Sequence, residues 1–171
     1  FVVPEETKDQ ELSDTVRWVA KMRTKKSPYI TSYTIFTTTD CNARCFYCFE
    51  LGWNRTHMTE ETALKAVQYI KNHCGGQKVS LSWFGGEPLV NTRVMDLICS
   101  ELQEKGVNFV SNITTNGDLL PECSDEQIRL WRIRSAQFTL DDVGDEYDRI
   151  KGLKGAYKRL EASIDRLARL G

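Results

Sequence analysis

Segments that favour β-strands alternate four times with segments that favour helices, and this alternation constrains the fold more than any other feature of the chain. Strands are predicted from alternating apolar residues, or from dense β-branched and aromatic residues, over residues 29–39, 78–84, 107–114 and 135–140. The connections are too long for hairpins, so the strands should run parallel with right-handed crossovers. The sequence therefore predicts an α/β fold built on a parallel sheet.

Start and stop signals place helices between the predicted strands. Thr59 can cap one helix, and the pair Gly75-Gly76 marks its end. Apolar residues at helical spacing predict further helices over residues 9–23, 92–105 and 156–170, and the capping box Ser124-Asp125-Glu126-Gln127 predicts a short helix from residue 124 onward. The acidic residues 141–148 are expected to form a loop. The chain is thereby divided into a lead-in helix and linker, residues 1–28, and a domain, residues 29–171.

Three of the six cysteines lie within eight residues, directly after the first predicted strand. Cys41, Cys45 and Cys48 can turn three thiolates toward one place, and thiolates are the ligands of soft metals and iron-sulfur clusters. A structural zinc site normally has four protein ligands, whereas a catalytic centre keeps one position open. His57 could supply a fourth ligand, so a zinc or iron-sulfur module without catalysis is the alternative. An electron-transfer protein is a third possibility.

Unusual loops follow all four predicted strands rather than preceding them. In a parallel sheet these carboxyl ends share one edge, which is where α/β proteins place their sites. The loops are the cysteine segment, Gly85-Gly86-Glu87-Pro88, Thr114-Thr115-Asn116-Gly117 and Leu140-Asp141-Asp142. The sequence therefore predicts one pocket formed by four separate loops.

Composition and charge exclude several classes of function. The formal net charge of −1 argues against a nucleic-acid binder that neutralises phosphates. The first residues form neither a signal peptide nor a membrane span, so we expect a cytoplasmic protein that does not bind membranes. The absence of an initiator Met suggests that the residues come from a longer chain. Cys74, Cys99 and Cys123 are scattered, and we expect them to be buried without a chemical role.

The motifs in these loops resemble those of the radical S-adenosylmethionine enzymes, within them the SPASM-type branch that modifies peptides or proteins. The resemblance covers residue 29 to the end and rests on the cysteine segment with Tyr47, on Trp83-Phe84-Gly85-Gly86-Glu87-Pro88-Leu89, on Thr114-Thr115-Asn116-Gly117, and on Phe138-Thr139-Leu140-Asp141 with Tyr147-Asp148-Arg149. It implies a partial (β/α) barrel, of which about four of six strand-helix units are present.

The resemblance also implies cofactors and partners. Cys41, Cys45 and Cys48 would bind three irons of a 4Fe-4S cluster, and the fourth iron would bind S-adenosyl-L-methionine. Reductive cleavage of that molecule would give a 5'-deoxyadenosyl radical that abstracts a hydrogen from a peptide or protein substrate. The electron would come from a donor such as a flavodoxin or ferredoxin.

Further contacts with S-adenosylmethionine are expected at the strand ends. Gly85 and Gly86 would let the main chain approach the ligand, and Glu87 or nearby carbonyls would receive its amino group. The remaining expected contacts are Tyr47, Thr115, Asn116, Thr139 and Arg159. The alternatives are a solvated Glu87, ordinary turn chemistry for Thr115 and Asn116, and a solvent-facing Arg159.

Overall fold

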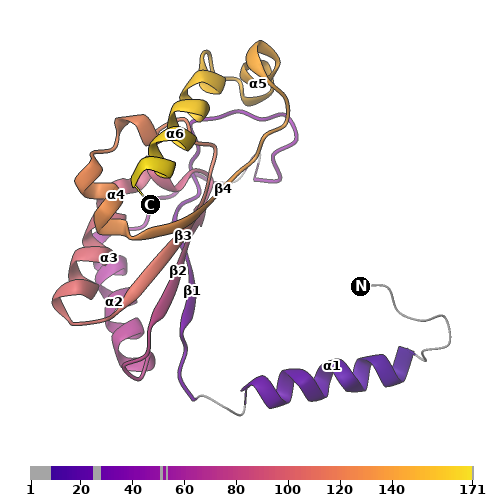
Figure 1. Cartoon of the computed structure of the whole chain (residues 1–171), viewed down its shortest axis with the longest axis vertical. Helices are drawn as coiled ribbons and strands as arrows, with labels where there is room; N and C mark the ends of the chain where they lie inside the picture. The colour runs from indigo at the N-terminus through magenta and orange to yellow at the C-terminus, as the bar shows by residue number, and fades with distance from the viewer. Residues whose placement is uncertain (1–8, 25–27, 51, 53, 171) are drawn as a thin grey trace.

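Four strands form one parallel sheet in the order β1-β2-β3-β4 (Figure 1). The computed structural model describes residues 9–24, 28–50, 52 and 54–170. The strands are β1 (Ser32–Thr38), β2 (Val79–Gly85), β3 (Phe109–Thr115) and β4 (Ile133–Phe138). The α/β prediction is therefore confirmed. The fourth strand begins two residues earlier than predicted, because Arg132 takes a left-handed conformation (φ 52°) that ends the preceding helix.

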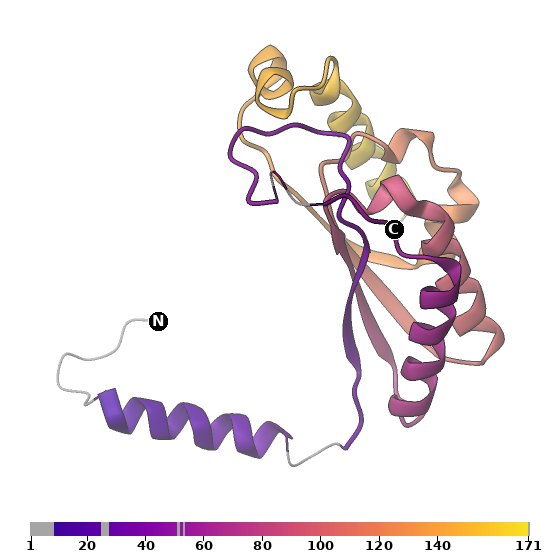
Figure 2. The ribbon, with the colours of Figure 1, turned by 180° about the vertical axis from the view of Figure 1, so that it is seen from behind.

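The helices lie where the caps and apolar spacing predict them. They are α1 (Asp9–Thr24), α2 (Glu60–His73), α3 (Thr92–Glu104), α4 (Asp125–Trp131) and α6 (Ala156–Leu170), with short 3₁₀ turns at Pro88–Asn91 and Leu120–Glu122. The Thr59 side chain accepts a hydrogen bond from the Thr62 amide, and Ser124 forms a complete capping box with Gln127. Figures 1 and 2 show α2, α3 and α4 on one face of the sheet and α1 apart from it.

The two faces of the sheet differ in chemistry. Toward the helices, β2 buries Leu81 and Trp83 completely, and burying such a side chain contributes about 1.5–3 kcal/mol. The opposite face carries a row of polar residues in register across all four strands, namely Thr34, Ser82, Asn112 and Ser135. Within this row the Ser135 hydroxyl donates to the Asn112 side-chain oxygen at 2.8 Å. None of the described helices covers this face in Figures 1 and 2, and this uncovered face is suited to polar contacts.

The prediction of a loop over residues 141–148 is wrong, because most of this segment belongs to a helix, α5 (Gly144–Lys151). Asp145 and Glu146 lie in its first turn, and Arg149 and Lys151 lie in its last turn. Each pair complements the helix dipole at its own end. Gly152, with φ 64°, then caps the helix in the left-handed conformation.

Two expectations concern parts of the chain outside this sheet. The lead-in over residues 1–28 is described only from residue 9, with residues 25–27 also outside the described part, and its helix is present as α1. Within the described residues, no helix combines the length and the apolar character that crossing a bilayer requires.

Candidate functional site

The four strand-end loops meet at one cavity of about 230 Å³. Its wall combines the cysteine segment with the ends of β2, β3 and β4, and it includes Cys41, Cys45, Tyr47, Cys48, Phe84, Gly85, Gly86, Thr115, Asn116, Thr139 and Lys151. Glu87 and Arg159 are absent from this wall. Of the eleven residues predicted for the site, nine therefore line a common cavity and two lie behind or beside it.

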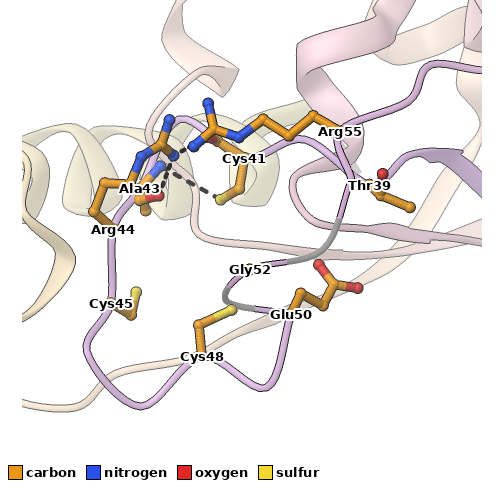
Figure 3. Close-up of a pocket in the computed structure, with 9 residues that line it drawn as sticks. All are labelled: Thr39, Cys41, Ala43, Arg44, Cys45, Cys48, Glu50, Gly52 and Arg55. Carbon is orange, nitrogen blue, oxygen red and sulfur yellow. Dashed lines mark hydrogen bonds between the residues drawn. The ribbon is translucent and has the colours of Figure 1, made fainter.

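The three clustered cysteines also line a smaller cavity of about 80 Å³ inside their own loop. Figure 3 shows Cys41, Cys45 and Cys48 around this cavity. The Cys48 amide donates to the Cys45 carbonyl at 3.2 Å, and the Ala43 amide points at the Cys41 sulfur, 3.4 Å away. Burial raises the pKa of Cys41 to about 11, so a metal centre there would have to displace a proton.

The donor set suits a cluster better than a single ion. Among the described side chains, no group of three His, Cys, Asp or Glu residues is arranged to hold one metal ion. A zinc ion needs its ligands gathered at one point, whereas the thiolates around a 4Fe-4S cluster bind different irons. His57 does not complete the set, because its Nδ1 lies 3.0 Å from the Thr38 hydroxyl and the residue bridges to β1. The structure therefore gives no support to a Cys3His zinc site.

The two glycines after β2 make room for the start of the cysteine segment. A Cβ atom on Gly85, whose φ is 142°, would lie 2.1 Å from the Thr38 carbonyl oxygen, and one on Gly86 would lie 2.4 Å from that of Asp40. The Gly86 amide donates to the Thr38 carbonyl at 3.1 Å. We predicted that these glycines allow close approach to a ligand. In the structure the close approach is to the chain that leads into Cys41.

Glu87 joins the ends of β2 and β3 from beneath the cavity. Its carboxylate is fully buried and accepts hydrogen bonds from the Thr115 hydroxyl at 2.8 and 3.0 Å, the Asn116 amide at 2.8 Å and the Leu89 amide at 3.1 Å. The alternative of a solvated Glu87 is wrong. Its direct contact with a ligand stays a prediction, because every contact it makes here is with the protein.

Stability should depend on pH through this carboxyl. Burial raises the pKa of Glu87 from 4.5 to about 7, against the lowering effect of its amide and hydroxyl donors. As the pH rises, Glu87 therefore loses its proton in the unfolded chain before it does so in the folded protein. Because of this difference, we expect the free energy of unfolding to fall by about 3 kcal/mol between about pH 4.5 and pH 7. Urea unfolding of metal-free wild type and Glu87→Gln at pH 5 and pH 8 measures this, since only wild type should lose the increment. Equal pH dependence in both proteins would contradict it.

Asn116 and Arg159 belong to a polar chain beside the cavity. Asn116 Nδ2 donates to Asn42 Oδ1 at 2.9 Å, and Asn42 Nδ2 donates to Asp118 at 2.8 Å. Arg159 Nε donates to the other Asp118 oxygen at 2.7 Å. The Arg159 side chain is 37% exposed and its guanidinium is paired with Asp118, so its contact with S-adenosylmethionine stays a prediction. Asn116 thus ties β3 to the cysteine segment.

Tyr47 and Lys151 form a contact that the sequence analysis did not predict. The Tyr47 hydroxyl donates to Asp141 Oδ2 at 2.6 Å, and Lys151 Nζ pairs with the same oxygen at 2.6 Å. Lys151 was missed because residues 141–148 were expected to form a loop. Gly144 and Gly152, which bracket a seven-residue segment with acids first and bases last, are the signal that could have revealed it.

The other cysteines and the second histidine have structural surroundings. Cys74, Cys99 and Cys123 are buried, as predicted. His73 lies in the last turn of α2, where its Nδ1 is 2.7 Å from the Tyr69 carbonyl oxygen, and its ring stacks on Tyr69. Among the described residues, the partly exposed cysteines are therefore those of the loop after β1.

Comparisons with known proteins agree with this arrangement. The model of the Radical SAM superfamily matches residues 35–171. A probable GTP 3',8-cyclase of Methanococcus maripaludis (strain C6) is 30% identical over 143 residues, which cover 80% of this chain and 46% of the relative. A probable GTP 3',8-cyclase of Pyrococcus abyssi is 31% identical over 144 residues, covering 75% and 44%. The chain thus spans about half the length of the curated relatives it matches.

Solved structures share the fold. A histidine-tagged anSMEcpe with bound AdoMet superimposes with a TM-score of 0.63 at 18% identity, over 82% of this chain and 40% of the other. "Native anSMEcpe with bound AdoMet and Kp18Cys peptide" gives a TM-score of 0.59 at 18% identity, over 81% and 41%. The partial barrel predicted from the sequence is therefore confirmed as a fold.

Proposed function

Because the chain belongs to the radical SAM superfamily, whose members use a 4Fe-4S cluster and S-adenosylmethionine, we propose that the cavity at the carboxyl ends of the strands binds both. The observation that carries the proposal is the meeting of three thiols with the ends of β2, β3 and β4 around one cavity. When bound, the reduced cluster supplies the electron that cleaves S-adenosylmethionine to methionine and a 5'-deoxyadenosyl radical. The residues of the chain bind, orient and shield these groups.

The three cysteines take the role of cluster ligands in this proposal. Cys41, Cys45 and Cys48 would hold the cluster, which would supply a binding position for S-adenosylmethionine. The start of the loop is held in place, since the Gly86 and Glu87 amides donate to the carbonyls of Thr38 and Asp40, which lead into Cys41. A backbone fixed in this way limits how far the thiols move, which keeps the cluster close to the same wall that receives S-adenosylmethionine.

In our proposal some of the predicted residues contact S-adenosylmethionine directly, and the others act through neighbouring groups. Main-chain groups of Gly85 and Gly86, the ring of Tyr47 and the hydroxyl of Thr139 line the cavity and contact the ligand directly. The remaining predicted residues act mainly through other groups, because their polar atoms already have protein partners. These are Glu87, Thr115, Asn116 and Arg159.

We propose a peptide or protein as the substrate of the whole enzyme. The uncovered face of the sheet lies next to the cofactor cavity and holds a further cavity of about 200 Å³, lined by Ser82, Asn112, Thr114, Ser135 and Gln137 among others. Hydroxyl and carboxamide side chains pair with peptide amides as donors and acceptors. The shared fold with a peptide-bound structure supports this class. The electron donor in the proposal is a flavodoxin or ferredoxin.

A nucleotide substrate is the second candidate, and the relatives with the higher sequence identity favour it. Both relatives compared above are named probable GTP 3',8-cyclases. A triphosphate is usually bound by Arg and Lys side chains. The polar row on the uncovered face, made of Thr34, Ser82, Asn112 and Ser135, carries hydroxyls and an amide in their place. For this reason we place the peptide first.

Substrate-dependent turnover separates the two candidates. Full-length protein, reconstituted anaerobically and reduced in the presence of S-adenosylmethionine, is incubated either with GTP or with a synthetic peptide library deuterated at Cα and Cβ. The peptide proposal predicts a mass change in library members and transfer of deuterium into 5'-deoxyadenosine. Consumption of GTP without peptide modification would overturn it in favour of the nucleotide. Zinc without iron in anaerobically purified protein would overturn both.

A further inference from the structure

Lys151 is a buried lysine in the wall of the cavity at the carboxyl ends of the strands. Its side chain is only 3% exposed, and it lines the same cavity as the three cysteines. Lysine is seldom buried unless it is paired, because removing an ammonium group from water is costly. Here the partner is Asp141, whose Oδ2 lies 2.6 Å from Nζ. A lysine placed at this cost at a cofactor site calls for a functional explanation.

Two contacts of Lys151 are with residues of the cysteine segment. Nζ lies 3.1 Å from the Tyr47 hydroxyl oxygen, which itself donates to Asp141 at 2.6 Å. The three side chains therefore form a closed triangle of polar contacts. The same lysine also accepts a main-chain hydrogen bond, from the Arg44 amide to its carbonyl at 2.7 Å. Tyr47 and Arg44 both lie between the cluster cysteines, so one residue holds the segment at two points.

Neighbouring groups fix Lys151 in place. Nζ lies 5.1 Å from the centre of the Tyr147 ring, within range of a cation–π contact. Gly152 lets α5 end against the cysteine segment, since a Cβ there would lie 3.3 Å from the Arg44 Cβ. The C-terminal end of α5 also favours a cation electrostatically. Lys151 thus connects the cysteine loop to the C-terminal end of a helix.

We infer that Lys151 is a positioning residue that, with Asp141 and Tyr47, fastens the cysteine segment to α5 and to the end of β4. The triangle joins the first strand-end loop to the fourth, just as Glu87 joins the second to the third. Without it the segment between Cys45 and Cys48 keeps fewer fixed contacts with the rest of the domain. The inference rests on the proposed function for the identity of the cluster, but the fastening itself is a property of the metal-free protein.

Hydrogen exchange of metal-free, full-length protein tests the fastening. In Lys151→Met, amides of the segment 43–49 should exchange about tenfold faster than in wild type, because local opening no longer has to break the triangle. Amides of β2 should exchange at the wild-type rate, which separates the effect from a general loss of stability. The matched control is Lys65→Met, which removes an exposed lysine paired with Glu61 on α2. Unchanged exchange in the segment, or equal acceleration in β2, would overturn the inference.

Two further variants and a second readout keep the test independent of folding defects and of the proposed function. Tyr47→Phe removes only the hydroxyl, and its effect should not add to that of Lys151→Met, because both break one triangle. In reconstituted protein each variant should release iron to a chelator roughly 10–100-fold faster than wild type. Additive effects in the double variant would contradict a shared contact. If wild-type protein binds no iron while the exchange results are as expected, the proposed function is contradicted and the fastening is still supported.

Discussion

Serine in place of Cys45 is expected to abolish cluster binding and S-adenosylmethionine cleavage by the full-length protein. The Cys45 thiol lines both the small cavity inside the loop and the larger cofactor cavity. A serine hydroxyl is a hard, protonated group and a poor iron-sulfur ligand, so only two thiols would remain. Iron and acid-labile sulfide content after anaerobic reconstitution measures the first loss, and formation of 5'-deoxyadenosine measures the second.

A cysteine outside the loop provides the matched control. Cys99 is fully buried in the core between the sheet and the helices, and Cys99→Ala removes a thiol there without adding a polar group. This variant should bind iron and cleave S-adenosylmethionine as wild type does, with some loss of stability from the small cavity that it leaves. A Cys45→Ser protein with wild-type iron content would show that the loop does not ligate the cluster.

Alanine at Gly85 should strongly destabilise the domain and displace the cysteine segment. The residue has φ 142°, and a Cβ would lie 2.1 Å from the Thr38 carbonyl oxygen. Backbone strain costs about 1–3 kcal/mol and the forced separation of β1 from β2 about 1–3 kcal/mol more. Urea unfolding of the metal-free protein measures the free energy, and iron content after reconstitution reports the position of the cysteines. We expect both to fall together.

A substitution at Gly76 is the control that separates the cost of backbone strain from the cost of steric conflict in Gly85→Ala. It has φ 74°, but a Cβ there would meet no atom within 4 Å. Gly76→Ala should therefore lose only the cost of the left-handed conformation, about 1–2 kcal/mol, and should retain full iron content. If Gly85→Ala proved no more destabilising than Gly76→Ala, the close approach of the strand ends would not be what requires glycine.

The sequence was sufficient to predict the fold and nine of the residues that line the cavity. Period-two strands, capped helices and strand-end loops are local signals, and parallel topology places the carboxyl ends of the strands on one edge. The thiols of the cysteine segment, Gly85, Gly86 and the β3 end accordingly line one cavity. What could be predicted was which loops meet, because that depends on topology alone.

The partners of individual side chains could not be predicted in the same way. Glu87 was expected to face a ligand, yet its carboxylate accepts hydrogen bonds from the Thr115 hydroxyl and from two main-chain amides. Whether a carboxylate at a strand end points into the cavity or beneath it depends on rotamer and packing, which leave no periodic signal. Lys151 escaped prediction for a different reason. Its helix is short and flanked by glycines, and eight residues carry too little periodicity to distinguish a helix from an acidic loop.

The most direct test of the central claim is the amount of 5'-deoxyadenosine formed by full-length protein that has been reconstituted anaerobically with iron and sulfide and then reduced with S-adenosylmethionine present. Our account predicts 5'-deoxyadenosine and methionine in equal amounts from wild type, and neither product from Cys45→Ser. Wild-type protein that carries a full complement of iron and sulfide yet leaves S-adenosylmethionine intact under reducing conditions would contradict the account.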